Sequence, residues 1–232
     1  MESSNEKLCL GTCGNDLQQR IAAKRSEGDM SPLRLGVLLS GSGTNLQAII
    51  DAIAAEKINA RVELVISSRA DAYGLIRAKE AHIPTLTIAR ELYKEPLIAD
   101  QVIAAELKQH DVDYVIMAGY MRKVHEPVLL GFPDRVVNIH PALLPSFQGA
   151  HGIDDAYARG VKITGVTVHF ANAVYDQGPI IAQEAVRIKE GMTRDELEAA
   201  IHEVEHVLYP QVIELLAEGR VQVDADGRVS IA

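Results

Sequence analysis

Tryptophan is absent from this chain of 232 residues, and aromatic residues together make up only 4% of it. A hydrophobic core must therefore be built from aliphatic side chains, which are plentiful because hydrophobic residues amount to 47%. No apolar run approaches the roughly 20 residues of a membrane-spanning helix. The first residues also lack the apolar stretch of a secretory signal. We therefore expect a cytoplasmic protein without a membrane partner.

Cysteine is nearly absent as well. Cys9 and Cys13 are the only two, and both lie near the start of the chain. We therefore expect no disulfide framework, and a reducing compartment fits. A metal site built on this pair would need two further ligands, and the neighbouring sequence offers none.

Positive charge is in the minority, since the formal net charge is −9. A protein that binds nucleic acid would carry a basic face, so nucleic acid is not an expected partner. A small anionic substrate is still compatible with this balance, because a local site can be basic or can use backbone N–H groups. We expect small-molecule substrates, and either a monomer or a homodimer.

From Leu33 onward, apolar runs of strand length alternate with helical patterns. This alternation is typical of a parallel sheet with helices on both faces. Strands are expected at 35–39, 62–66, 85–88, 114–117 and 136–139, and helices at 44–56, 73–81, 98–109 and 123–130. The sequence thus predicts an α/β fold with an open, mostly parallel sheet and a Rossmann-like N-terminal half.

The C-terminal half has a different pattern. Period-two runs at 163–170 and 180–188 predict an antiparallel strand pair. Thr193 and Glu196 form the sequence of a capping box, which predicts the start of a long helix. Asp226-Gly227 lies between two short alternating runs and predicts a terminal hairpin.

The N-terminal segment is polar and carries no strand pattern. We interpret residues 1–33 as a flexible extension that contains at most a short helix within 17–24. Residues 34–232 are then expected to form a single domain, which suits their length.

The strand expected at 136–139 ends in two polar side chains. Asn138 and His140 lie two residues apart, so a strand places them on the same side, and Pro141 then stops the strand. Ligands of open α/β sheets bind at the carboxyl ends of strands. Histidine exchanges protons near neutral pH, and asparagine can donate a hydrogen bond to an oxyanion. The alternative is a polar strand end without a catalytic role.

A glycine-rich turn, Ser40-Gly41-Ser42-Gly43-Thr44-Asn45-Leu46, joins the first strand to the first helix. Glycines at such a turn let backbone N–H groups approach a phosphate at the helix N-terminus. Leu46 stands where the dinucleotide fingerprint needs glycine, and the Walker lysine is missing. The turn therefore favours a phosphate monoester over NAD or ATP. The alternative is a structural turn in which Thr44 caps the helix.

Two further groups of polar residues carry candidate chemistry. Asp176 follows a strand that contains His169, and a carboxylate beside an imidazole would stabilise the imidazolium; an Asx turn before Gly-Pro is at least as good an explanation. His202 and His206 have the i, i+4 spacing of zinc ligands, but no third ligand is apparent, so we expect no metal.

Four ordered motifs resemble one family, the phosphoribosylglycinamide formyltransferases. The segments that carry the resemblance are 40–50 (SGSGTNLQAII), 118–122 (AGYMR), 138–145 (NIHPALLP) and 165–179, which contains Asp-Gln-Gly-Pro. The resemblance implies transfer of a formyl group from 10-formyltetrahydrofolate, as co-substrate, to the glycyl amine of glycinamide ribonucleotide in purine synthesis. It implies no metal.

The resemblance also implies roles for individual residues. Asn138, His140 and Asp176 match the catalytic trio. The ribonucleotide-binding positions are matched by Gly43, Thr44, Asn45 and Glu205. The folate-binding positions are matched by Met121, Arg122, Lys123 and Val124, together with Asn138.

The chain also departs from the family. Pro96 stands where members often have an arginine that reaches the folate, with Arg90 and Lys94 nearby, and Ala142 and Gln148 replace residues that are common near the site loop. Two related activities are rivals. A formyltetrahydrofolate deformylase would need a regulatory domain larger than the 33 N-terminal residues, and a methionyl-tRNA formyltransferase would need a further C-terminal domain. A folate- or nucleotide-binding protein without activity is the alternative from a different class.

Overall fold

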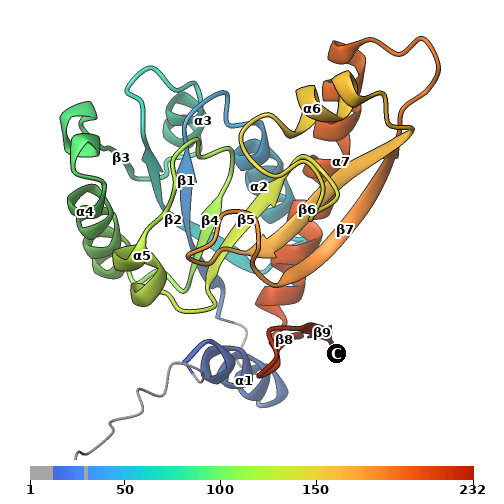
Figure 1. Ribbon diagram of the computed structural model, residues 1–232. Coiled ribbons are helices and arrows are strands. Elements are labelled where there is room, and N and C mark those ends of the chain that lie inside the picture. Colours follow the sequence, from blue (N-terminus) through green and yellow to red (C-terminus); the bar gives the residue numbers. More distant parts are fainter. Residues whose placement is uncertain (1–12, 29–30) are drawn as a thin grey trace, which may run out of the picture.

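The computed structural model describes residues 13–28 and 31–232, and a seven-stranded sheet forms its centre (Figure 1). The strand order is β3-β2-β1-β4-β5-β6-β7; β1 to β5 pair in parallel, whereas β6 and β7 are antiparallel to their neighbours. The strands are β1 (Leu33–Leu39), β2 (Ala60–Ser67), β3 (Thr85–Thr87), β4 (Tyr114–Met117), β5 (Val136–His140), β6 (Ile163–Phe170) and β7 (Ile180–Arg187). The expected open, mostly parallel sheet with an antiparallel pair is confirmed.

Helices cover both faces of this sheet (Figure 1). One face carries α4 and α5, and the other carries α2, α3 and the long α7, which confirms the expected C-terminal helix. The helices are α1 (Cys13–Ser26), α2 (Thr44–Ala54), α3 (Gly74–Glu80), the 3₁₀ helix η1 (Arg90–Lys94), α4 (Pro96–Gln109), α5 (Glu126–Gly131), α6 (Gly152–Arg159) and α7 (Arg194–Ala217). A hairpin of β8 (Val221–Val223) and β9 (Val229–Ile231) follows. Among the described residues, no helix has the length and apolar character needed to cross a bilayer.

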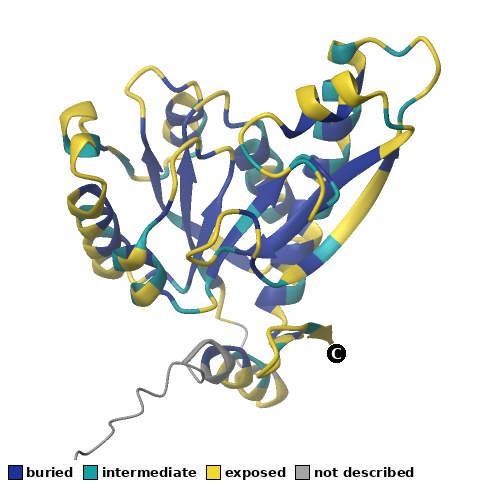
Figure 2. Cartoon of the chain, viewed as in Figure 1, coloured by how far each residue is buried: buried dark blue, intermediate teal, exposed yellow. Residues whose placement is uncertain are grey.

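The continuous apolar run of β1 results from burial on both faces. Leu35, Val37 and Leu39 pack into the core under α2 and α7, whereas Leu38 points into the core under α4. A strand covered on both sides has no solvent face and so needs no polar alternation. Figure 2 shows the central strands β1 and β4 as buried along most of their length.

Two sets of hydrogen bonds hold α7 in place, one in its first turn and one on the side of the helix that faces the sheet. Thr193 and Glu196 form the expected capping box, with Thr193 Oγ1 accepting from Glu196 N and Glu196 Oε2 accepting from Thr193 N. Farther along, the buried hydroxyl of Tyr209 lies 2.9 Å from the carbonyl oxygen of Val137 and 3.1 Å from that of Met117. This shared hydrogen bond ties α7 to β4 and β5. Glu205, one turn earlier on the same face, thereby reaches the end of the sheet that carries the polar residues.

The described part of the N-terminal segment differs from the flexible extension expected there. The short helix expected within 17–24 is part of the longer α1, which packs on the domain. Leu17 joins the main core, and Gln18 Nε2 donates to the hydroxyl of the buried Tyr114 over 2.6 Å. Residues 1–12, with Cys9, lie outside the described residues, and the boundary at residue 33 stays a prediction.

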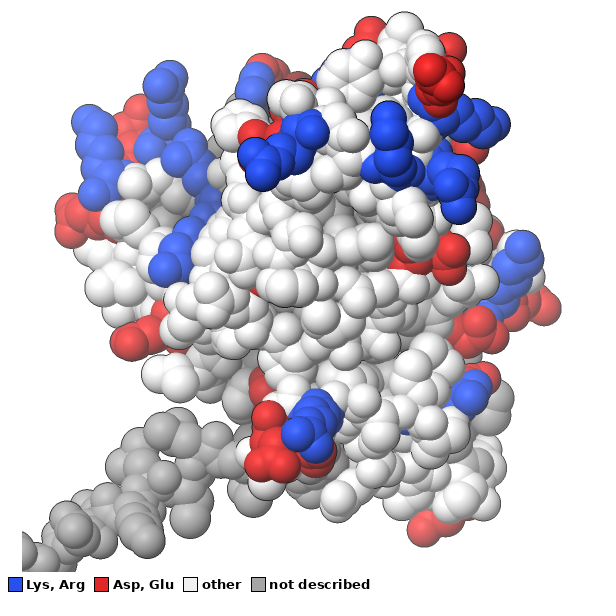
Figure 3. Space-filling model, turned by 45° about the vertical axis from the view of Figure 1, so that its right-hand side comes forward, with Lys and Arg blue, Asp and Glu red and all other residues white. Residues whose placement is uncertain are grey.

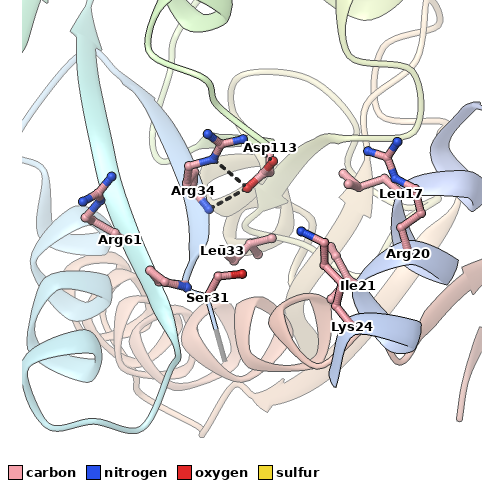
Figure 4. A pocket seen from close by; sticks show the side chains of 10 residues that line it. Leu17, Arg20, Ile21, Lys24, Ser31, Leu33, Arg34, Arg61 and Asp113 are labelled. Atoms are coloured by element: carbon pink, nitrogen blue, oxygen red, sulfur yellow. Dashed lines mark hydrogen bonds and ion pairs between the residues drawn. The ribbon is translucent and has the colours of Figure 1, made fainter. Parts of the chain in front are cut away.

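A cavity of about 460 Å³ lies between α1 and the amino ends of β1 and β2 (Figure 4). Its wall contains Arg34, which donates to Asp113 over two distances of 3.2 Å, and Arg61, which pairs with Glu63. These guanidinium groups are neutralised within the protein. The cavity is at the end of the sheet opposite to the candidate residues.

Candidate functional site

The order of the strands opens a crevice between β1 and β4. The chain runs outward from β1 to β2 and β3, then returns to place β4 on the other side of β1. The loops after β1 and β4 therefore diverge, and ligands of open α/β sheets bind at such a point. A cavity of about 400 Å³ lies there, lined by residues of the loops after β1, β4 and β5 and of α7.

Hydrogen bonds between the two loops shape the floor of this cavity. The Ser40 hydroxyl accepts a hydrogen bond from the backbone N–H of Met121 over 2.8 Å and lies 2.6 Å from the hydroxyl of Ser68. The backbone N–H of Ser40 donates to the carbonyl of Gly119. The glycine-rich turn and the 118–124 segment are thus one connected structure.

Gly43 is required by its conformation and by its neighbour. It has a φ of 70° at the N-cap of α2, and a Cβ added there would lie 2.5 Å from the Cα of Gly74. The close approach of Gly43 and Gly74 joins the turn to α3. The glycine-rich turn is therefore a structural turn whatever ligand it takes.

Gly43→Ala is expected to lower the free energy of unfolding by about 1–3 kcal/mol, because alanine is strained at positive φ and its methyl group meets backbone. Gly41→Ala is the matched control, because a Cβ at Gly41 meets nothing within 4 Å. Urea unfolding of both variants measures the difference. Equal stability of the two would contradict the packing described for Gly43.

Asn45 and Glu205 meet across the cavity although they are 160 positions apart. The Asn45 Nδ2 group donates to Glu205 Oε2 over 3.0 Å, while Asn45 Oδ1 is buried without a partner among the described residues. Burial raises the pKa of the Glu205 carboxyl, which is 5% exposed. A buried carboxylate and an unpaired amide oxygen are groups to which a ligand with N–H or O–H donors can bind.

Asn138 and His140 lie on the same side of β5 and both line the cavity, as the sequence predicted. His140 is 4% exposed, and its Nε2–H group donates to the Phe147 carbonyl over 2.8 Å. The Nδ1 atom of His140 lies 3.5 Å from Asp176 Oδ2. Both ring nitrogens therefore face oxygen acceptors, an arrangement that a ring carrying two protons satisfies.

Asp176 is brought to His140 by a turn after β6. Its φ of 53° lies in the left-handed region, which aspartate tolerates better than most residues. The Asp176 Oδ2 atom also accepts a hydrogen bond from the backbone N–H of Gly149 over 2.8 Å. The side chain is buried and held on two sides, so it is more than the Asx turn that the sequence also allowed.

His169 completes the group, and the sequence analysis gave it no role of its own. It lies opposite Asn138 in the antiparallel register of β5 and β6. The Nδ1–H group donates to the Phe170 carbonyl over 3.0 Å, so Nε2 can accept from the Asn138 amide over 3.1 Å. Burial lowers the pKa of His169 and keeps the ring neutral. The sequence showed only a histidine within a strand. Its contact with Asn138 can be recognised only once the register of β5 and β6 is known.

The 121–124 segment forms one wall beside these residues. The side chain of Met121 is exposed, and the residue is 65% accessible, whereas Val124 is buried. Lys123 and Val124 border a small hollow that also contains Asn138 and Asp176. Asp100 fixes the end of the segment, because its Oδ2 atom accepts from both the backbone N–H and Nδ1 of His125.

The histidines of α7 divide between two places. His202 lines the cavity with Glu205, whereas His206 borders a separate groove between α2 and α7. Within residues 13–28 and 31–232, no group of three His, Cys, Asp or Glu side chains has the arrangement of a metal site.

An open α/β sheet with an amide, an imidazole and a carboxylate at its carboxyl edge is the architecture of one class of acyl-transferring enzymes. The sequence model of that class, the formyl transferase family, matches residues 33–213, and the chain belongs to this family. The solved relatives are more specific. The chain is 47% identical to glycinamide ribonucleotide transformylase 1 of Symbiobacterium toebii, with a TM-score of 0.84 over 87% of this chain and 94% of that one.

Curated relatives agree. The phosphoribosylglycinamide formyltransferase of Bacillus subtilis is 36% identical over 183 residues, which are 79% of this chain and 94% of that protein. The human trifunctional purine biosynthetic protein adenosine-3 is 40% identical over 196 residues, or 84% of this chain, but the match spans only 19% of the human protein. The resemblance that the four motifs indicated is confirmed.

Proposed function

We propose that this protein transfers the formyl group of 10-formyltetrahydrofolate to the glycyl amine of glycinamide ribonucleotide, a step of de novo purine synthesis. The observation that carries this proposal is the meeting of Asn138, His140 and Asp176 at a cavity whose other end is the glycine-rich turn. One end then suits a phosphate and the other suits acyl transfer.

The reaction is a direct acyl transfer. The glycyl amine attacks the formyl carbon, and the resulting tetrahedral intermediate carries a negatively charged oxygen. Asn138 uses one amide N–H on His169, which leaves the second N–H to donate to this oxyanion. Because Nε2 of the neutral His169 accepts a hydrogen bond, it holds the Asn138 side chain with its amide nitrogen, and not its amide oxygen, toward His169.

His140 supplies the second donor. Its Nε2–H group donates to the Phe147 carbonyl, and we propose that this bond is exchanged for the oxyanion when substrates fill the cavity. Asp176 stabilises the protonated ring through Nδ1. His140 then gives a proton to the departing folate nitrogen as the tetrahedral intermediate collapses, and the proton that the former amine nitrogen loses on becoming an amide is returned to the ring.

The ribonucleotide lies toward the glycine-rich turn. Backbone N–H groups of Gly43, Thr44 and Asn45, at the positive end of α2, receive the phosphate. Glu205 and Asn45 receive the polar groups of the glycinamide ribose. The folate lies along Met121, Arg122, Lys123 and Val124, with its formyl group beside Asn138. The surface agrees with anionic substrates: in the view of Figure 3 the Lys and Arg side chains gather mainly on the upper half, where the strands end.

Glu205→Gln is expected to raise KM for the ribonucleotide about tenfold or more, because hydrogen bonds to a charged group contribute roughly 1.5–3 kcal/mol, with a smaller effect on kcat. The control is Glu203→Gln on the exposed side of the same helix turn. Steady-state kinetics at fixed folate concentration measure both variants. Equal KM values for the two variants would remove Glu205 from the ribonucleotide site.

The same substitution is expected to change the pH dependence of stability. Burial raises the folded-state pKa of Glu205 above its ordinary value of 4.5, so the folded state keeps its proton to higher pH than the unfolded state does. Glu205 therefore lowers the free energy of unfolding as pH rises from 4.5 to the raised pKa. Across this pH range, the free energy of unfolding measured by urea should change less with pH for Glu205→Gln than for the native protein.

A three-way assay tests the proposed function. The protein is mixed with 10-formyltetrahydrofolate, with and without glycinamide ribonucleotide, and the absorbance of the deformylated folate is followed. Product only in the presence of the ribonucleotide is the expected result. Product without it would mean a deformylase that uses water, and no product in either mixture would mean a binding protein.

A further inference from the structure

Three side chains lie in one row across the antiparallel part of the sheet. In the register of β5, β6 and β7, His140 lies opposite Thr167, and Thr167 lies opposite Gln183. Residues that face each other across an antiparallel pair project from the same face of the sheet. The chain that follows His140 folds back over this face, because Ala142 and Leu144 form hydrogen bonds with the other two members of the row.

The hydroxyl of Thr167 is the centre of these contacts. It is fully buried, donates to the carbonyl of Ala142 over 2.7 Å and accepts from the backbone N–H of Leu144 over 3.0 Å. It also accepts from Gln183 Nε2 over 3.0 Å, and the other hydrogen of this amide goes to the Leu144 carbonyl over 2.9 Å. A hydroxyl has one hydrogen and two lone pairs, so the capacity of Thr167 is completely used. Both contacts of Gln183 therefore need a donor, which an amide supplies and a carboxylate does not.

A glycine makes room for the residue between these two anchored positions. A Cβ added at Gly165 of β6 would lie 2.7 Å from Cδ2 of Leu143, so this side chain packs directly against the strand. The segment 142–144 is thus held by its backbone and by its side chain. We call its contact with Thr167, Gln183 and Gly165 the loop anchor.

The loop anchor precedes a strained residue whose carbonyl faces His140. Phe147 has a φ of 53°, in the left-handed region that bulky side chains rarely adopt. Such a backbone conformation persists only where the surrounding structure holds it. The loop is held before Phe147 by the loop anchor and after it by Gly149, whose N–H donates to Asp176 Oδ2 over 2.8 Å. Between these two points the Phe147 carbonyl lies 2.8 Å from His140 Nε2.

We propose that Gln183 is a positioning residue, which acts on His140 through the loop anchor. Its amide fixes the start of the loop, and with it the Phe147 carbonyl that orients the imidazole ring. None of the residues assigned above to either substrate belongs to 142–149. Loss of the loop anchor should therefore slow the chemical step and leave substrate binding almost unchanged. This inference rests on the proposed function.

Gln183→Glu keeps the shape of the side chain but replaces its donor nitrogen with an oxygen. Because Gln183 is exposed on the edge strand, we expect this variant to fold. Its kcat should fall about 3- to 10-fold, since two weak hydrogen bonds are lost, while KM for both substrates stays within about twofold. The control is Gln222→Glu, the same change at an exposed position of β8, which should leave kcat within about twofold. Equal kcat values for the two variants, or a rise in KM without a fall in kcat, would overturn the inference.

Two variants of Thr167 test whether hydrogen bonds or packing make the loop anchor. Thr167→Val removes the hydroxyl at nearly constant volume, so the Leu144 N–H and the Ala142 carbonyl lose their partner. Its kcat should fall about 10- to 100-fold, because buried polar groups are left unpaired. Thr167→Ser retains the hydroxyl and should stay within about threefold of the native kcat. Losses of equal size in the two variants would assign the effect to packing and overturn the inference.

A double-substitution cycle separates positioning from a general loss of structure. If Gln183 acts through His140, Gln183→Glu should change the residual kcat of His140→Gln by less than about twofold, because the group that it positions is already missing. A loss of about 3- to 10-fold on both backgrounds would overturn the inference.

The ring proton of His140 distinguishes this inference from the proposed function. The Nε2–H proton is buried and hydrogen-bonded, so in ligand-free protein with isotope-labelled histidine it should give a slowly exchanging magnetic resonance signal. Loss of the signal in His140→Gln identifies it, and its absence from the native protein would contradict the bond to Phe147. Gln183→Glu should speed its exchange with water about 3- to 10-fold, whereas Gln222→Glu should not.

The two failures have different signatures. If the exchange rate in Gln183→Glu equals the native rate while the native protein forms product, the inference alone fails. If the native protein forms no product from 10-formyltetrahydrofolate and glycinamide ribonucleotide, the proposed function fails, and the catalytic role of Gln183 fails with it.

Discussion

His140→Gln is expected to lower kcat about 100- to 10,000-fold, the range that a single acid–base group contributes. Glutamine can still donate to the Phe147 carbonyl, so the loop stays in place, but it cannot carry a proton between the intermediate and the folate nitrogen. KM for both substrates should change little, because the loss falls on the transition state. Steady-state kinetics of the purified variant measure the effect.

A second histidine provides the control for this experiment. His151 belongs to the same loop, but its side chain is 75% exposed and does not line the cavity. His151→Gln should retain activity within about twofold, as is usual for surface changes away from a site. If the two glutamine variants had similar kcat values, the assignment of His140 would be wrong.

Asp176→Asn is expected to lower kcat about 100- to 1,000-fold with almost no change in stability. Asparagine tolerates a φ of 53° as well as aspartate does, and its amide oxygen can still accept from Gly149 N–H. What is lost is the negative charge 3.5 Å from His140 Nδ1, and with it the stabilisation of the imidazolium.

The separation of kcat from KM is the sharper readout for Asp176. Because the carboxylate acts through the ring of His140, the loss should fall on kcat, while KM for both substrates stays within about twofold. Matched thermal melts verify that the fold is intact. A kcat near that of the native protein would exclude Asp176 from the mechanism.

Local patterns in the sequence predicted most of the framework. The alternation of apolar runs gave every strand of the large sheet to within two residues at each end. The alternation of side chains along β5 predicted that Asn138 and His140 lie on the same side of the strand. The capping box predicted the start of α7 at the correct residue. These features follow from interactions within a few residues, so the order of residues alone determines them.

Other elements were missed or predicted too short because their stability comes from elsewhere in the chain. The 3₁₀ helix η1 has no periodic pattern, and the contact of Tyr93 with Tyr120 helps to hold it in place. The helix α1 has little amphipathic character, and it is fixed by Leu17 and by the hydrogen bond from Gln18 to Tyr114. Neither partner can be read from the local sequence.

What the sequence by itself determined is the class of fold, the residues at the end of β5 and the glycine-rich turn before α2. Only the tertiary structure decided which distant residues meet them. The register of β6 against β5 places His169 at Asn138, the turn after β6 delivers Asp176 to His140, and Tyr209 holds α7 where Glu205 reaches Asn45. The physical reason is range: parity and capping act over a few residues, whereas a site between strand ends is made by the packing of the whole sheet.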